Sequence, residues 1–207
     1  MALHVFNHPL IKHKLTMIRD KHCGTKQFRE IVEEISGLMV YEISRDFELD
    51  EIMVETPIAA TTGYQLKKDV VVVPILRAGL GMVEGIAHLI PSLKIAHIGM
   101  YRDKETLLPK LYYAKFPENI QQAKVFILDP LLATGGSILE AIHQLKKQEV
   151  QDITVVSLIG VMEGVNKILH AYPEMNIYLG SLDEKLNDHA YIIPGLGDAG
   201  DRLFGTK

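Results

Sequence analysis

The stretch VFILDPLLATGGSILEAIHQLKK, residues 125–147, decides the fold of this sequence. Its first four residues are apolar without interruption, which is typical of a strand covered on both faces of its sheet. After Asp129 a short loop leads to two glycines, and apolar residues then recur at three- and four-residue steps from Ile138 to Leu145. A buried strand that passes through a loop into an amphipathic helix is half of a parallel α/β unit.

The same alternation of apolar runs and helical patterns extends over most of the chain. Strands are expected at residues 70–76, 95–100, 125–128, 153–159 and 177–179, and helices at 80–89, 137–147 and 165–171. The first quarter of the chain is predicted to be helical, with apolar residues at helical spacing from Phe28 to Met39. We therefore expect one α/β domain over residues 1–207, a mainly parallel sheet flanked by helices after an N-terminal helical segment. Ligands of such sheets bind at the carboxyl ends of the strands.

The composition is that of an ordinary globular protein. Of 207 residues, 47% are hydrophobic and 23% are charged, and the formal net charge is −4, so no nucleic-acid or anionic-membrane partner is expected. The single cysteine, Cys23, cannot form an internal disulfide bond, which fits a reducing compartment. No apolar run approaches the roughly 20 residues that span a membrane, and the N-terminus shows no signal-peptide pattern. We expect a soluble, cytoplasmic protein.

The loop after Asp129 has the chemistry of a phosphate site. Gly135 and Gly136 leave backbone N–H groups open at a helix N-terminus, where the helix dipole favours an anion. Thr134 and Ser137 add hydroxyl donors, and Asp129 could accept hydrogen bonds from two sugar hydroxyls. The alternative is an ordinary helix capped by Thr134 or Ser137. No lysine follows the glycines, so the loop is not a Walker A motif.

Two further loops place an arginine after a predicted strand. In VPILRAGLGMV, residues 73–83, Arg77 offers a fork of donors suited to phosphate or diphosphate oxygens. In YRDKETLLPKLYYAK, residues 101–115, Arg102 follows the strand directly and is expected to meet an anion, while the charged segment could close over a site. The alternatives are a surface arginine beside a tight turn and a solvated charged hairpin.

A literal G-x-G-x-x-G occurs at residues 195–200, but its context is wrong for a dinucleotide site. Only seven residues follow Gly200, too few for a helix and a second strand. We expect instead a loop whose backbone wraps a small planar ligand, with Asp198 inside it, and the alternative is a turn-rich tail. The nine histidines have no cysteine or carboxylate cluster beside them, so no metal site built by the protein is expected.

Together these motifs carry a resemblance. DPLLATGGS, residues 129–137, resembles the motif of type I phosphoribosyltransferases that binds phosphoribosyl diphosphate (PRPP), and is similar to the uracil branch in particular. VPILRAGLGM and YIIPGLGDAGDR resemble the same branch, as does TPIAATTGY at residues 56–64. Most type I enzymes have a second acidic residue where this chain has Pro130, whereas in the uracil branch that proline is normal.

The resemblance implies a role for each matching residue. Those that would bind PRPP are Asp129, Pro130, Leu131, Leu132, Ala133, Thr134, Gly135, Gly136 and Ser137, with residues 133–137 around the 5-phosphate and Asp129 on the ribose hydroxyls. Arg77 and Arg102 would contact the diphosphate. The residues that would hold uracil in a C-terminal hood are Ile192, Gly197, Asp198 and Ala199, and Asp198 would also face PRPP. Asp198, Arg77 and Arg102 are the implied catalytic residues.

The implied reaction converts uracil and PRPP to UMP and diphosphate in pyrimidine salvage. Mg²⁺ would be the cofactor, bound mainly through PRPP rather than by protein ligands. The resemblance further implies a homo-oligomer, a dimer or a tetramer, and makes GTP a candidate allosteric activator. Two alternatives remain: a phosphoribosyltransferase for another base such as a purine, and an RNA-binding regulator on the same fold. The short Gly-rich segment at 195–200 counts against the first, and the negative net charge against the second.

Overall fold

The computed structural model describes residues 2–102 and 109–206, and for Ala2 and Arg102 it describes the backbone alone. The α-helices are α1 (Pro9–Arg19), α2 (Thr25–Ile43), α3 (Val83–Ala87), α4 (Gly136–Lys147), α5 (Met162–Ala171) and α6 (Ala199–Phe204). Short 3₁₀ turns are η1 (Ser44–Asp46), η2 (Ala78–Met82) and η3 (Ile120–Gln122). The strands are β1 (Ala2–Val5), β2 (Leu49–Glu55), β3 (Ala60–Leu66), β4 (Val70–Leu76), β5 (Lys94–Ile95), β6 (His97–Arg102), β7 (Pro109–Lys115), β8 (Lys124–Leu128), β9 (Leu131–Leu132), β10 (Ile153–Val161), β11 (Asn176–Asp183), β12 (Lys185–Leu186) and β13 (Ile192–Ile193).

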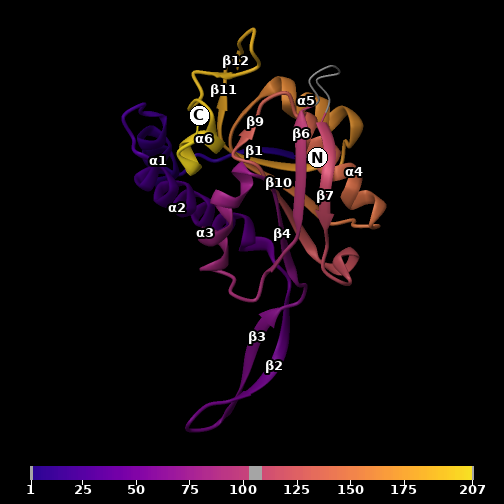
Figure 1. Cartoon of the computed structure of the whole chain (residues 1–207). Coiled ribbons are helices and arrows are strands. Elements are labelled where there is room, and N and C mark those ends of the chain that lie inside the picture. The colour runs from indigo at the N-terminus through magenta and orange to yellow at the C-terminus, as the bar shows by residue number, and fades with distance from the viewer. Residues whose placement is uncertain (1, 103–108, 207) are drawn as a thin grey trace.

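A single sheet organises the main body, in the order β1-β11-β10-β8-β4-β6-β7 (Figure 1). The pairings along this order are parallel except for the antiparallel pair β6–β7. The five strands expected from the apolar runs correspond to β4, β6, β8, β10 and β11. The mainly parallel α/β fold predicted from the sequence is therefore confirmed.

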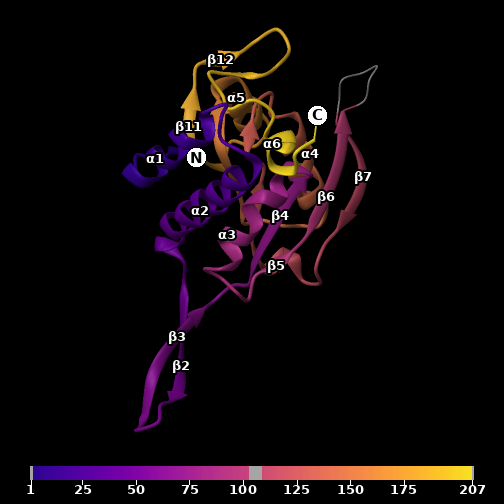
Figure 2. The ribbon, with the colours of Figure 1, turned by 60° about the vertical axis from the view of Figure 1, so that its left-hand side comes forward.

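Helices cover both faces of the sheet, which explains why its central strands are apolar throughout. Val70 and Val72 of β4 pack into one core with residues of α1 and α2. Val71 and Val73, which point the other way, pack into a second core with residues of α4 and α5. Figures 1 and 2 show α1, α2 and α3 on one side of the sheet and α4 on the other. No helix in the described part of the chain is long and apolar enough to cross a membrane.

The helical prediction for the first quarter is confirmed by α1 and α2. The antiparallel hairpin of β2 and β3, which projects away from the sheet (Figures 1 and 2), was not predicted. The expected helix at 80–89 is instead the turn η2 followed by the five-residue helix α3. This region packs against α2 so closely that a Cβ atom at Gly85 would collide with the backbone oxygen of Glu33. Backbone contact therefore takes the place of a long amphipathic face.

Candidate functional site

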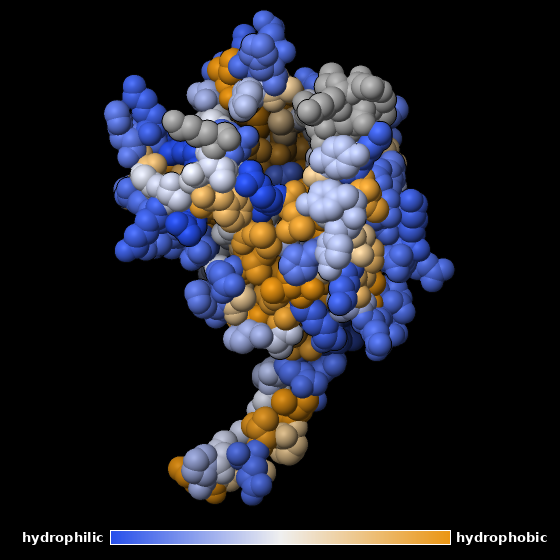
Figure 3. Space-filling model, in the orientation of Figure 1, coloured by the Kyte–Doolittle hydropathy of each residue, from blue (hydrophilic) through white to orange (hydrophobic). Residues whose placement is uncertain are grey.

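The carboxyl ends of three neighbouring strands lie at one edge of the sheet. Pro74 of β4 is level with Leu128 of β8, and Leu128 is level with Val156 of β10. This register brings the segments that follow β4 and β8 together, so that Arg77 and Asp129 begin loops at the same edge. Figure 3 shows a hollow there, below the loop that carries β12.

The first turn of α4 is open to an anion. Gly135 is the N-cap residue, at φ 73°, and no side chain caps the helix. The alternative that Thr134 or Ser137 serves as the cap is therefore wrong. A Cβ atom at residue 135 would lie 2.8 Å from the backbone oxygen of Gly164, so both the positive φ and the close packing favour glycine. The N–H groups of the first helical turn lack partners within the helix and are suited to an anion.

A small pocket lies directly in front of this helix N-terminus. Its volume is about 90 Å³. Thr134, Gly136 and Ser137 form one wall, and the others come from β6, β7 and α5: Met100, Tyr101, Pro109 and Lys167. Backbone donors, two hydroxyl groups and one ammonium group converge here, which suits a single phosphate group. We refer to this site below as the phosphate pocket.

Asp129 lies at the end of β8, partly buried, and its carboxylate is unusually basic. Burial raises the pKa of Asp129 to about 7, while the backbone N–H of Leu131 opposes the rise. That N–H donates to Oδ1 over 3.4 Å, and the Asp129 N–H itself donates to the Val156 oxygen over 3.3 Å. A desolvated carboxylate next to a phosphate pocket can accept hydrogen bonds from sugar hydroxyls.

Arg77 stands at the start of η2 and contacts the C-terminal segment. Its Nη2 lies 3.6 Å from Oδ1 of Asp201 and 3.5 Å from Oγ1 of Thr206. Its guanidinium also lies over the ring of Phe204, 5.6 Å from the centroid. The Arg77 side chain is 58% exposed, so it remains available to a ligand at the sheet edge.

A second pocket, of about 260 Å³, joins the loop after Asp129 to the C-terminal segment. Of the predicted base-binding residues, Ile192, Gly197 and Asp198 line it, whereas Ala199 is buried at the start of α6. The remaining lining residues are Leu131, Ala133, His189, Ala190 and Tyr191. Asp198 also caps α6, accepting the Asp201 N–H over 2.9 Å. We refer to this site as the base pocket.

The loop between β13 and α6 is held by an arginine that the sequence did not single out. Arg19 of α1 forms a two-pronged ion pair with Asp183, at 2.6 and 2.7 Å, and donates to the Gly195 oxygen over 2.8 Å. Asp183 in turn accepts the Gly195 N–H over 2.9 Å. Burial alone would raise the pKa of Asp183, but these donors hold it below its usual value. The pair therefore stays charged and fixes both polar groups of the Gly195 backbone.

A second arginine, Arg202, fixes the next residue of the loop. Its guanidinium donates to the oxygens of Leu196, over 2.8 Å, and Asp20, over 2.7 Å, and also to that of Ile18. The ring of Phe28 lies beneath it at 4.3 Å. Burial lowers the pKa of Arg202. These contacts join the loop to α1 and α2, far away in the sequence.

Arg102 lies at the last position of β6, where its backbone is opposite Pro109 of β7. Its side chain falls outside the described part of the structure, as do residues 103–108 of the segment 101–115 that was predicted to close over a site. The prediction that Arg102 meets an anion stays a prediction.

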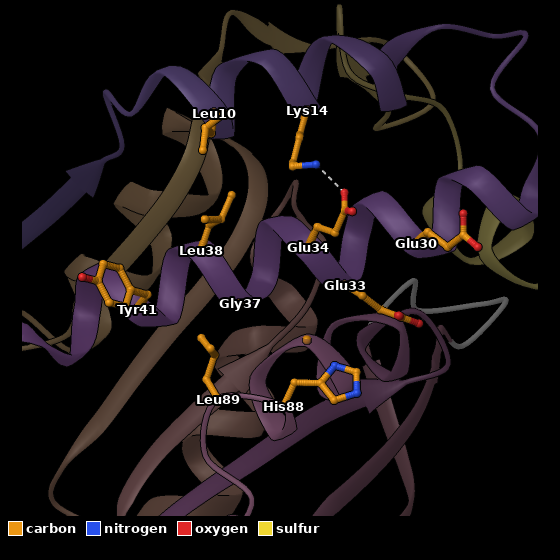
Figure 4. Close-up of a pocket in the computed structure, with 11 residues that line it drawn as sticks. Leu10, Lys14, Glu30, Glu33, Glu34, Gly37, Leu38, Tyr41, His88 and Leu89 are labelled. Atoms are coloured by element: carbon orange, nitrogen blue, oxygen red, sulfur yellow. Dashed lines mark hydrogen bonds and ion pairs between the residues drawn. The ribbon is translucent and has the colours of Figure 1, made fainter.

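A larger pocket lies away from this edge, between α1, α2 and α3 (Figure 4). Its volume is about 770 Å³, and none of the residues predicted for substrate lines it. Glu30, Glu33 and Glu34 give it an acidic wall, and Glu34 forms an ion pair with Lys14 across it. This charge disfavours a phosphorylated ligand.

Comparison with known proteins agrees with the motifs. The family model for uracil phosphoribosyltransferase matches residues 5–206. The uracil phosphoribosyltransferase of Pediococcus pentosaceus is 58% identical over 98% of both chains, and that of Anoxybacillus flavithermus is 55% identical over 99% of both. The solved structure of the AQ2163 protein of Aquifex aeolicus has a TM-score of 0.93 at 39% identity and covers 99% of this chain and 98% of its own.

A distant structure shows the fold alone. The adenine phosphoribosyltransferase of Trypanosoma brucei, solved with AMP, pyrophosphate and ribose-5-phosphate, has a TM-score of 0.60 at 13% identity, over 93% of this chain and 85% of its own. The family match and the two bacterial relatives extend over nearly the whole chain, far beyond the short motifs. The chain belongs to the uracil phosphoribosyltransferase family.

Proposed function

We propose that this chain transfers the phosphoribosyl group of PRPP to uracil, forming UMP and diphosphate in pyrimidine salvage. The observation that carries the proposal is the shared wall of the base pocket. Leu131 and Ala133, from the segment proposed to bind PRPP, line the base pocket together with Ile192 and Gly197. A base held there would lie beside a ribose whose 5-phosphate occupies the phosphate pocket.

The proposed mechanism assigns positioning to the loops and charge stabilisation to the arginines. The phosphate pocket anchors the 5-phosphate, and Asp129 accepts hydrogen bonds from the ribose hydroxyls. N1 of uracil attacks C1 of the ribose as the bond from C1 to the diphosphate oxygen breaks, with inversion at C1. The N1 proton passes to water, and the electron pair of the broken bond leaves with the diphosphate. Arg77 and Arg102 stabilise the negative charge that gathers on the departing diphosphate. Holding both reactants in place supplies much of the remaining acceleration.

Mg²⁺ fits this site as a partner of the substrate's own oxygens. Within residues 2–102 and 109–206, no three His, Cys, Asp or Glu side chains gather as metal ligands. Mg²⁺ commonly retains several waters and binds through substrate phosphates, so a dedicated protein cage is not required. When bound, the ion would neutralise part of the diphosphate charge.

The base pocket suggests how uracil would be selected. Gly195 and Gly197 have φ values of 60° and 83°. Gly195 uses its N–H and C=O groups within the protein, so the donors and acceptors for a base would come from Gly197 and its neighbours in the base pocket. A fixed set of backbone donors and acceptors can match O2, N3–H and O4 of uracil. Cytosine carries an amine donor where uracil carries O4, and its N3 accepts where the N3–H of uracil donates. Two pairings would therefore be reversed, and buried polar groups would be left unpaired. The arginine contacts of this loop keep the donor and acceptor positions fixed.

We expect PRPP and Mg²⁺ to yield diphosphate when uracil is present and not when cytosine, hypoxanthine or adenine is offered. The measurement is the initial rate of diphosphate release with each base offered separately. Turnover with a purine would overturn the assignment of the base pocket. Tight PRPP binding without turnover of any base, together with filter retention of RNA at physiological salt, would favour the regulator instead.

The proposal extends to a homo-oligomer through the β2–β3 hairpin. Met53 and Tyr64 lie on one face of the hairpin and are 74% and 64% exposed, and Ile58 at its turn is 96% exposed. Figure 3 shows hydrophobic residues among hydrophilic ones on the projecting arm. A two-stranded ribbon is marginally stable alone in water, so a second copy of the chain that covers this face would stabilise it.

Replacing Met53 and Tyr64 by glutamate should therefore lower the molar mass measured by light scattering to that of a monomer. The matched control replaces Thr61 and Gln65, exposed residues on the opposite face of the same hairpin, by glutamate. That control should keep the mass of the wild type. A monomeric wild type, or equal dissociation of both variants, would contradict the assignment.

GTP activation rests on the resemblance alone, and initial rates with and without GTP test it.

A further inference from the structure

Helix α5 packs directly behind the phosphate pocket. A Cβ atom at Gly164 would collide with the backbone oxygen of Ala133, and one at Gly135 would lie 2.8 Å from the oxygen of Gly164. The first turn of α5 and the loop that leads into α4 are thus in backbone contact. Side chains on the same face of α5 are brought to the rim of the phosphate pocket.

Lys167 is the side chain that this packing places at the rim of the phosphate pocket. It follows Gly164 by three residues and so lies on the same helix face. Its Nζ is 3.9 Å from the point where a Cβ of Gly136 would stand, and it lines the phosphate pocket together with Thr134 and Ser137. Among the described residues, Lys167 has no hydrogen-bond or ion-pair partner. Its ammonium group, which has no partner in the described part of the chain, therefore faces the open N-terminus of α4.

We propose that Lys167 binds the 5-phosphate of PRPP, a role that rests on the proposed function. The rest of the phosphate pocket offers neutral donors, namely backbone N–H groups and the hydroxyls of Thr134 and Ser137. Lys167 adds the positive charge to this set, as a flexible point charge that adapts to a tetrahedral anion. The 5-phosphate does not react and is present in substrate and product alike. The contact therefore stabilises the bound substrate and the transition state equally. Its loss should change KM and leave kcat unaltered.

Replacing Lys167 with glutamine should raise KM for PRPP about five- to tenfold, the range of a charge-assisted contact at a partly exposed site. The value of kcat should stay within about twofold, because uniform binding does not alter the bound transition state. Lys167→Arg should recover most of the loss. The matched control is Lys147→Gln, which removes the same charge from an exposed lysine at the far end of α4, on the order of 16 Å away along the helix.

A second measurement does not depend on turnover. The Kd of ribose 5-phosphate, followed by calorimetry, should rise by the same factor in Lys167→Gln, while inhibition by magnesium diphosphate should remain that of the wild type. Unchanged ribose 5-phosphate binding, an equal loss in Lys147→Gln, or an equal weakening of diphosphate would overturn the assignment. If ribose 5-phosphate binding depends on Lys167 and no base is turned over, Lys167 is still assigned to the phosphate and the proposed function fails separately.

Discussion

Replacing Arg77 with alanine is expected to lower kcat/KM for PRPP by about 10²–10³-fold, the loss seen when one preorganised donor to a developing charge is removed. The leaving diphosphate gains negative charge as the bond to C1 breaks, and Arg77 lies at the edge of the sheet where that group would sit. Its contacts within the protein are weak by comparison. The ion pair with Asp201 is 3.6 Å long and more than a third exposed on both sides, so its effect on stability is small. The melting temperature should therefore stay that of the wild type.

Arg45→Ala provides a closely matched control. Arg45 is an exposed arginine that pairs with Glu42 and lies over the ring of Tyr41 at 5.8 Å, much as Arg77 pairs with Asp201 and lies over Phe204. It lies in η1, after α2. Initial rates and melting curves of both variants separate the two explanations. Wild-type kcat/KM in Arg77→Ala would contradict the diphosphate role, and an equal loss in Arg45→Ala would show a general effect of charge.

The strands that carry the site could be predicted because their surroundings leave a mark in the sequence. A strand covered by helices on both faces must be apolar at successive positions, and β4 coincides with the expected run at 70–76. The amphipathic stripe of α4 likewise located a helix at 137–147, one residue from its observed start. Once strand ends are known, the loops that follow them are known as well. This is why the sequence alone could place Arg77 and Asp129 in loops at the same edge of the sheet.

The sequence of the β2–β3 hairpin carries no pattern of this kind. In β2, exposed residues alternate with half-buried ones, and none is fully buried, so it carries neither a continuous apolar run nor an apolar stripe of helical period. Its conformation depends on pairing with β3 rather than on a core. The sequence therefore did not predict the hairpin.

The arginines behind the base pocket could not be predicted for a different reason. Arg19 and Asp183 are 164 positions apart, and each is an ordinary charged residue in its local context. Their pairing exists only because α1 packs beside β11. Lys167 is similar, since it lies on the polar face of an amphipathic helix, where lysine is the usual solvent-facing residue. The only sequence feature that pointed to Arg202 is that it ends the motif YIIPGLGDAGDR. The resemblance assigned no role to it.

Because the pKa of Asp129 is raised, we expect PRPP binding to depend on pH. In the free protein this carboxyl titrates at about 7, whereas hydrogen bonds from two ribose hydroxyls favour its ionised form. Below pH 7, binding must therefore release a proton, and the Kd should rise by about tenfold per pH unit. Above pH 7 the Kd should level off. The phosphate groups of PRPP also titrate near pH 6. The pH dependence of the Kd is therefore compared with that of Asp129→Asn, in which the phosphates still titrate but residue 129 does not.

Through the same carboxyl group, the stability of the folded protein should fall with rising pH, whereas PRPP affinity should increase. The folded-state pKa of Asp129 lies above the unfolded value of 3.8, so between those values the folded chain holds a proton that the unfolded chain has released. The contribution to stability is complete below the unfolded pKa and is lost as the pH rises through about 7. The melting temperature of the wild type minus that of Asp129→Asn should thus fall from pH 5 to pH 8, while the wild type's advantage in PRPP affinity grows. If neither difference changes between pH 5 and pH 8, Asp129 is ionised throughout and its carboxylate does not set the pH dependence.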